Sequence, residues 1–119
     1  MSKDYQRTDR VGAEMQRELA VLIRDEIKDP GLGMVTVQAV RVVRDLSQAK
    51  VFFTTLGAQF TREESASHLN QVAGHLRWLL GKSMKLRSIP KLHFVYDDSV
   101  EHGEHLSHLI EQAVTEKSS

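Results

Sequence analysis

An apolar repeat near the start of the chain ends at a proline, and this combination restricts what the first third of the chain can form. Apolar residues recur at three- and four-residue steps from Val11 to Ile27, which is the spacing of one face of an α-helix. Thr8 or Asp9 can cap this helix, and Pro30 cannot extend it. The chain is therefore predicted to begin with a helix whose apolar face needs a second layer to cover it.

The residues after the proline have the composition of strands. The segment 34–43 is rich in β-branched residues, and its alternation shifts phase between Val37 and Val40. That shift indicates either a β-bulge or a strand buried on both sides. A second alternating segment follows at 49–56, and the short link 44–48 between the two predicts an antiparallel hairpin.

A long helical segment with a break is predicted between the hairpin and the last strand. Thr61 and Glu64 have the spacing of a capping box at its start. Gly74 and Gly81 stand inside the helical pattern, where glycine costs about 1 kcal/mol relative to alanine. We expect the helix to be broken or sharply turned at Gly74, and a third strand to follow at 92–96.

The order of these elements predicts the fold class. A helix, two strands, a broken helix and a third strand indicate an α+β domain with helices covering one face of a three-stranded sheet. With 40% hydrophobic and 27% charged residues, the composition is that of an ordinary globular domain. Residues 1–100 are expected to form this single domain, and residues 101–119 an acidic tail that is partly helical or mobile.

Several classes of protein are excluded by what the sequence lacks. The absence of cysteine excludes a disulfide framework and a thiolate metal site. The N-terminus is polar, without the apolar core of a secretory signal, and no apolar run approaches membrane-spanning length. We expect a cytoplasmic protein with no membrane partner. A monomer is expected because no extended apolar stripe is left unassigned.

The formal net charge of zero hides an uneven distribution. Residues 62–91 hold six cations and two acids, whereas residues 92–119 hold one cation and six acids. The segment 74–91 contains no acid at all. Its five cations are Arg77, Lys82, Lys85, Arg87 and Lys91. This pattern predicts a basic working surface with an acidic tail beyond it.

Trp78 shares a helical face with Lys82 and Lys85, away from the side of Leu76 and Leu80 that should be buried. One interpretation is a surface that binds phosphates, with an aromatic ring that can stack on a base. The alternative is that the charges form a solvated face and that Trp78 packs under a neighbouring loop.

Seven short motifs occur in one order along most of the chain. They are Arg10-Val11; Met15-Gln16-Arg17-Glu18; Ile27-Lys28-Asp29-Pro30 with Leu32-Gly33; Arg44-Asp45-Leu46 with Ala49-Lys50-Val51; Gly74-x-Leu76-Arg77; Leu80-Gly81-Lys82-x-Met84-x-Leu86-Arg87; and Pro90-x-Leu92-x-Phe94. Together they resemble the ribosome-binding factor A family. The resemblance implies a type II KH-like domain with the order α-β-β-α(kinked)α-β. In that family an Ala-x-Gly kink replaces the usual Gly-x-x-Gly loop, and the matching positions here are Val72, Ala73 and Gly74.

The resemblance also implies a function. It implies an assembly factor that binds the immature small (30S) ribosomal subunit and its 16S ribosomal RNA late in maturation, with a role in growth at low temperature. The family's basic helix matches Arg77, Lys82, Lys85 and Arg87. Binding would then rest on phosphate contacts and RNA shape, with no catalysis, no cofactor and no small-molecule substrate. The competing hypothesis is a protein-interaction module that uses Trp78 and the acidic tail.

A nucleotide-binding loop is rejected. Gly81-Lys82-Ser83 lacks the required glycine five residues earlier, where Leu76 stands, and the preceding segment has a helical pattern. No serine, histidine and carboxylate arrangement stands out, and a small three-stranded domain offers little room for a catalytic pocket. We therefore expect no enzyme activity.

The histidines do not predict a metal site. His102, His105 and His108 repeat every three residues, and steps of three drift around a helix, so a polar tail is the better interpretation. His93 is predicted to be a face residue of the third strand and not a catalytic base.

Overall fold

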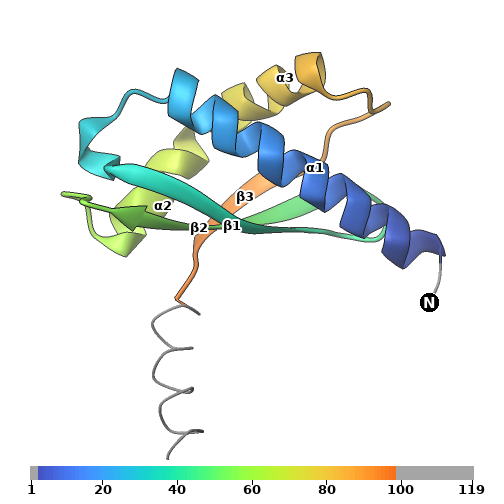
Figure 1. Ribbon diagram of the computed structural model, residues 1–119, viewed down its shortest axis with the longest axis horizontal. Helices are drawn as coiled ribbons and strands as arrows, with labels where there is room; N and C mark the ends of the chain where they lie inside the picture. Colours follow the sequence, from blue (N-terminus) through green and yellow to red (C-terminus); the bar gives the residue numbers. More distant parts are fainter. Residues whose placement is uncertain (1–2, 99–119) are drawn as a thin grey trace, which may run out of the picture.

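The computed structural model describes residues 3–98, which form two layers, a helical layer and a three-stranded sheet (Figure 1). The predicted α+β class and order of elements are confirmed. The acidic tail predicted at 101–119 lies outside the described residues. The elements are α1 (Lys3–Glu26), a short 3-10 helix (Pro30–Leu32), β1 (Met34–Val42), β2 (Gln48–Leu56), α2 (Arg62–Gln71), α3 (Ala73–Ser83) and β3 (Lys91–Tyr96).

The sheet has the strand order β1-β2-β3. The predicted hairpin is confirmed, because β1 and β2 pair antiparallel with Met34 opposite Leu56. The register shifts between Val37 and Ala39, so the phase change in the sequence marks a bulge. β3 pairs with β2 in parallel, with Val51 opposite Phe94, and the crossover that this direction requires is made by α2 and α3.

The core lies between the helices and one face of the sheet. Met15 and Leu19 of α1 are fully buried, and α1 packs mainly on β1 and also against α3. In Figure 1 both helices lie above the sheet. Every second residue is buried from Ala49 to Phe53 of β2 and from Leu92 to Phe94 of β3. The rings of Phe53 and Phe94 meet edge to face with centroids 6.3 Å apart. The other face of the sheet is left uncovered by residues 3–98.

The start of α1 was predicted wrongly. The helix begins at Lys3, so Thr8 and Asp9 lie inside it and do not cap it. Most residues before Thr8 are polar and they have no apolar periodicity, but arginine, lysine and glutamine are good helix formers. The presence of Thr8 and Asp9, which are favourable cap residues, therefore does not determine where the helix begins.

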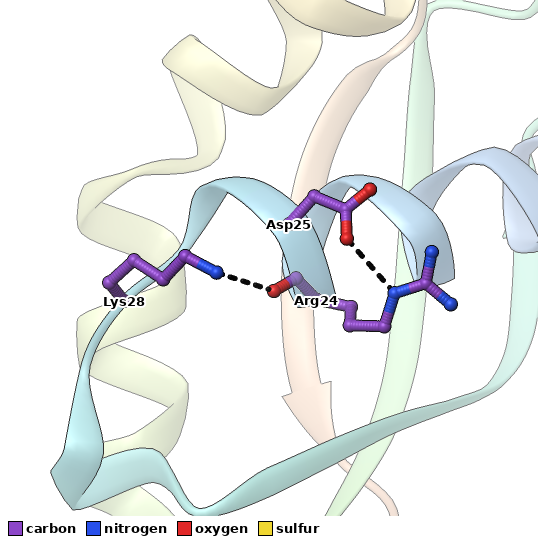
Figure 2. A network of polar contacts seen from close by, with 3 residues as sticks. All are labelled: Arg24, Asp25 and Lys28. Carbon is purple, nitrogen blue, oxygen red and sulfur yellow. Dashed lines mark hydrogen bonds and ion pairs between the residues drawn. The ribbon is translucent and has the colours of Figure 1, made fainter.

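The last turn of α1 is closed by charged side chains (Figure 2). Lys28 Nζ donates to the backbone carbonyl of Arg24 at 3.4 Å, and that carbonyl is one of the final four that lack a partner within the helix. Arg24 Nε donates to Asp25 Oδ1 at 3.0 Å, and this hydrogen bond lowers the pKa of the Asp25 carboxyl. Both side chains are exposed, so the pair adds little to stability.

The second helical segment begins as predicted and breaks at a different residue. Thr61 and Glu64 form the complete capping box, with Thr61 Oγ1 accepting from the Glu64 backbone and Glu64 Oε1 accepting from the Thr61 backbone. The break lies at Val72, whose φ of −101° and ψ of 7° end α2 and start α3. The predicted kink at Ala73 and Gly74 is therefore one to two residues too late, because both are the first residues of α3. Val72 and Ala73 pack against the core, so packing and not glycine freedom sets the position.

Candidate nucleic-acid interface

The outer side of α3 is a mixed basic and aromatic surface. Leu76 and Leu80 are fully buried, whereas Trp78 is 57% exposed and Lys82 is exposed on the opposite side of the helix. The predicted division into two faces is thus confirmed for Trp78 and Lys82, but it is wrong for Lys85, because α3 ends at Ser83 and Lys85 lies in the loop that follows. The exposure of Trp78 rules out the alternative that it packs beneath a loop of residues 3–98. We use the name basic face for the exposed residues Arg77, Trp78, Lys82, Lys85, Arg87 and Lys91.

Trp78 already has a cation on its ring. Lys82 Nζ lies 3.7 Å from the ring centroid, which is a cation–π contact, and the ring of His75 lies 6.0 Å away at an interplanar angle of 21°. The three side chains come from successive turns of α3. An incoming base could therefore stack on this ring face only after Lys82 moves off it.

Arg77 has a structural role that the sequence did not predict. Its Nε donates to the backbone carbonyl of Ile89 at 2.9 Å. Ile89 is buried, so this hydrogen bond ties the loop 84–90 to α3. Arg77 consequently positions the loop that carries Lys85 and Arg87, in addition to presenting its own charge.

A shallow depression lies on this side of α3, lined by Gly74, Arg77, Trp78, Gly81, Lys82 and Ile89. The two glycines are not required by internal packing. A Cβ on Gly74 would meet nothing within 4 Å, and one on Gly81 would only reach Ile89 at 3.8 Å. Their lack of a side chain therefore leaves the backbone of α3 open to close approach from outside.

The remaining cations of the basic face extend beyond this depression. Lys85 and Arg87 are exposed in the loop after α3, and Lys91 is exposed at the start of β3, but none of them lines the depression. Within residues 7–98, no acidic side chain forms an ion pair with these three or with Arg77 and Lys82.

The nearest acids along the chain lie away from the basic face. The segment 65–96 contains no acid. Beyond it, Asp98 pairs with Arg62 at 2.6 Å, past the end of β3 opposite to Lys91. Within the described part of the chain, the cations of the basic face thus have no acid as an ion-pair partner.

Other candidate sites receive no support from the described residues. No group of three or more histidine and carboxylate side chains within them is arranged to hold a metal ion, and His102, His105 and His108 lie outside that range. His93 is exposed on the sheet, as predicted. Gly81, Lys82 and Ser83 form the end of α3 and no phosphate loop. None of the helices between residues 3 and 98 has the length and apolar character needed to cross a membrane.

Comparison with known families explains this arrangement of elements. The family model described as ribosome-binding factor A matches residues 7–110, which includes the whole sheet and the basic face. The chain belongs to the ribosome-binding factor A family. Relatives of that name in Azotobacter vinelandii and Ectopseudomonas mendocina are each 59% identical over 119 residues, covering 98% of this chain and 92% of theirs.

Solved structures of the family have the same fold. The crystal structure of ribosome-binding factor A from Thermus thermophilus matches with a TM-score of 0.68 at 27% identity, over 75% of this chain and 93% of that chain. A homology model of the same Thermus protein, fitted into a cryo-electron microscopy map of its complex with the 30S subunit, matches with a TM-score of 0.63 at 28% identity, over 73% and 91%. The α+β, KH-like fold inferred from the motifs is therefore confirmed.

Proposed function

We propose that this protein binds the immature small (30S) ribosomal subunit and its 16S ribosomal RNA in the cytoplasm. It assists late maturation and supports growth at low temperature, as a monomer and without catalysis or a cofactor. Membership of the ribosome-binding factor A family supports this function. So does the Thermus relative that has been fitted into a map of its 30S complex.

The proposed mode of binding rests on one observation. Within residues 7–98, the cations of the basic face have no acid as an ion-pair partner. Five cations and an exposed tryptophan follow one another over 15 residues, and no acid of residues 7–98 forms an ion pair with them. Lysine and arginine on an exposed helix contact phosphates and position a protein on RNA without reading bases. Specificity would come from the shape of the ribosomal RNA.

The test is the salt dependence of binding to immature 30S particles. Charge reversal at Lys82, Lys85 and Arg87 should lower the affinity by more than ten-fold and reduce the slope of log K against log salt by roughly 3, since each lost phosphate contact contributes about 0.9. The matched control reverses Arg7, Arg10 and Arg17, three exposed cations of α1, with the same change in net charge. Equal effects of both variants, or no effect of either, would contradict the proposal.

A protein-interaction module is the second candidate, favoured by the 57% exposure of Trp78. Exposed aromatic residues are typical anchors of protein interfaces. In that case binding to 30S particles would persist at high salt and be abolished by Trp78→Ala alone, whereas the charge reversal would leave it intact.

A further inference from the structure

The uncovered face of the sheet carries a row of basic side chains that crosses all three strands. Arg41 of β1 lies opposite Lys50 of β2, and Lys50 lies opposite His93 of β3. All three are exposed, whereas their sequence neighbours pack toward the helices, as the burial of Val51 and Phe94 shows. We call Arg41, Lys50 and His93 the cationic row.

The cationic row is unfavourable for the isolated domain. Like charges directly opposite each other on a sheet are destabilising, and a cross-strand acid would relieve them. Neither this row nor the rows on either side of it contains an acid. The preceding row instead adds Lys91, which lies opposite Gln48 on the same face. An external polyanion would supply the missing negative charge.

On the same uncovered face, the next row is apolar and has an aromatic ring at its centre. Ala39, Phe52 and Val95 lie opposite one another across β1, β2 and β3. All three are half-buried, and none of them belongs to the core cluster or to the residues packed against it. Phe52 therefore lies on the uncovered face beside Lys50, at the middle of the sheet.

We propose that this uncovered face is a second RNA-binding surface, in which the cationic row contacts phosphates and Phe52 stacks on an unpaired base. A sheet that combines exposed cations with an aromatic ring suits single-stranded RNA, because every base has a face that can stack. The inference rests on the proposed function for the nature of the ligand. It adds a surface on the sheet layer, opposite to α3 and with Lys91 common to both surfaces, so that one domain would contact two RNA segments.

The test compares the two surfaces with two RNA probes. The variant Arg41→Gln/Lys50→Gln/His93→Gln and the variant Phe52→Leu are titrated against a labelled, unstructured RNA of about 12 nucleotides and against a duplex of equal length. Loss of the row should reduce the salt slope for single-stranded RNA by about 1.4, since two permanent cations contribute roughly 0.7 each. Phe52→Leu should weaken single-stranded binding about five-fold or more while changing duplex binding less. The control is Arg7→Gln/Arg10→Gln on α1, which should leave both unchanged.

The unfolding midpoint of each variant shows whether weaker RNA binding comes from lost RNA contacts or from a destabilised fold. Because Arg41 and Lys50 are like charges opposite each other, neutralisation of the row should leave the unfolding midpoint unchanged or raise it. Weaker RNA binding together with a lower midpoint would overturn the inference. Unchanged binding of single-stranded RNA would also overturn it.

Binding to immature 30S particles separates this inference from the proposed function. A row variant that binds those particles normally, beside a basic-face variant that does not, would reject the second surface alone. If both variants bind normally, the proposed function fails as well. If the row variant loses 30S binding but keeps its affinity for free RNA, the row contacts a ribosomal protein and not RNA. That result would overturn the inference.

Discussion

The side-chain amide of Asn70 pairs with the backbone of Phe94 as a neighbouring strand would. Phe94 N–H donates to Asn70 Oδ1 at 2.8 Å, and Asn70 Nδ2 donates to the Phe94 carbonyl at 3.0 Å. β3 is an edge strand, and open edges invite pairing with other chains. Gln16 acts similarly at the opposite edge, where its Nε2 donates to the carbonyls of Val37 and Gln38 at the bulge, both at 3.1 Å. One amide therefore protects each edge of the sheet.

Asn70→Ala should destabilise the fold by about 1–3 kcal/mol, because it leaves two part-buried backbone groups of Phe94 without their partners. Urea denaturation monitored by circular dichroism measures the loss. Ser67→Ala, an exposed change on the same helix, should stay within about 0.5 kcal/mol of the wild type. Equal stability of the two variants would mean that water replaces Asn70 at no cost.

Arg77→Lys should separate the charge of Arg77 from its hydrogen bond to Ile89. The lysine retains the positive charge but lacks the Nε–H that donates to the Ile89 carbonyl, so the free energy of unfolding should fall by about 0.5–1.5 kcal/mol. The salt slope for binding to 30S particles should stay near the wild-type value. Arg77→Met should lose both properties, and a lysine variant as stable as the wild type would remove the anchoring role.

RNA binding should quench the fluorescence of Trp78, the single tryptophan of the chain, because a stacked base must replace Lys82 on the ring. The measurement is an emission titration with single-stranded RNA at low salt. Lys82→Met should preserve the quenching and reduce the salt slope by about 1. Emission that stays constant while labelled RNA is seen to bind would show that the base does not stack there.

The capping box should make stability depend on pH below 4.5. The backbone N–H of Thr61, which donates to the carboxylate, is the main cause of a lowered pKa of Glu64 in the folded protein. A group whose pKa is lower when folded contributes stability above its ordinary value, here 4.5, and loses it as the pH falls through the folded value. Glu64→Gln should flatten this part of the pH profile of the melting temperature.

A companion change at the same cap tests its strength at neutral pH. Thr61→Ala should cost about 0.5–2 kcal/mol at pH 7, since it removes the side chain that accepts from the Glu64 N–H. Glu63→Gln, on the same first turn but outside the box, is the control. A wild-type unfolding midpoint for Thr61→Ala would indicate that the helix end frays without consequence.

Two glycine substitutions should have opposite effects on stability. Gly74→Ala should raise the free energy of unfolding by up to about 1 kcal/mol, because its Cβ meets nothing and Gly74 lies inside α3. Gly12→Ala should lower it by about 1–3 kcal/mol, because its Cβ would lie 2.6 Å from the Val40 carbonyl oxygen. If the open backbone at Gly74 serves close approach of RNA, the stabilised variant should bind 30S particles more weakly. Normal binding of the Gly74→Ala variant to 30S particles would show that the open backbone at Gly74 has no role in binding.

The sequence predicted the elements where a pattern is local. The change of phase between Val37 and Val40 located the bulge, and Thr61 with Glu64 located the start of α2, because both signals depend only on nearby residues. The start of α1 and the break at Val72 were misplaced. The start of α1 was misplaced because good helix formers extend the helix beyond its apolar repeat, and the break at Val72 because it depends on packing against the core.

The candidate site was also predicted only in part, because some of its contacts depend on residues far apart in the sequence. Helical arithmetic placed Trp78 and Lys82 on one exposed face, which the structure confirms. The bond from Arg77 to Ile89 spans 12 positions and has no signal in the sequence. The cationic row was not predicted, because alternation shows that Lys50 points outward but not that Arg41 and His93 lie beside it. Strand register decides that, and it becomes visible only in three dimensions.

The parallel pairing of β2 with β3 dictates an order of events during synthesis. The central strand is complete at Leu56, but its partner on one side begins only at Lys91, after both later helices have been made. Pairing across such a separation is slow compared with closing the hairpin. The loop that Arg77 holds through Ile89 leads directly into β3, so its C-terminal end is fixed only when β3 docks. The surface proposed to meet the ribosome is therefore among the last features of the domain to be assembled on the ribosome that makes it.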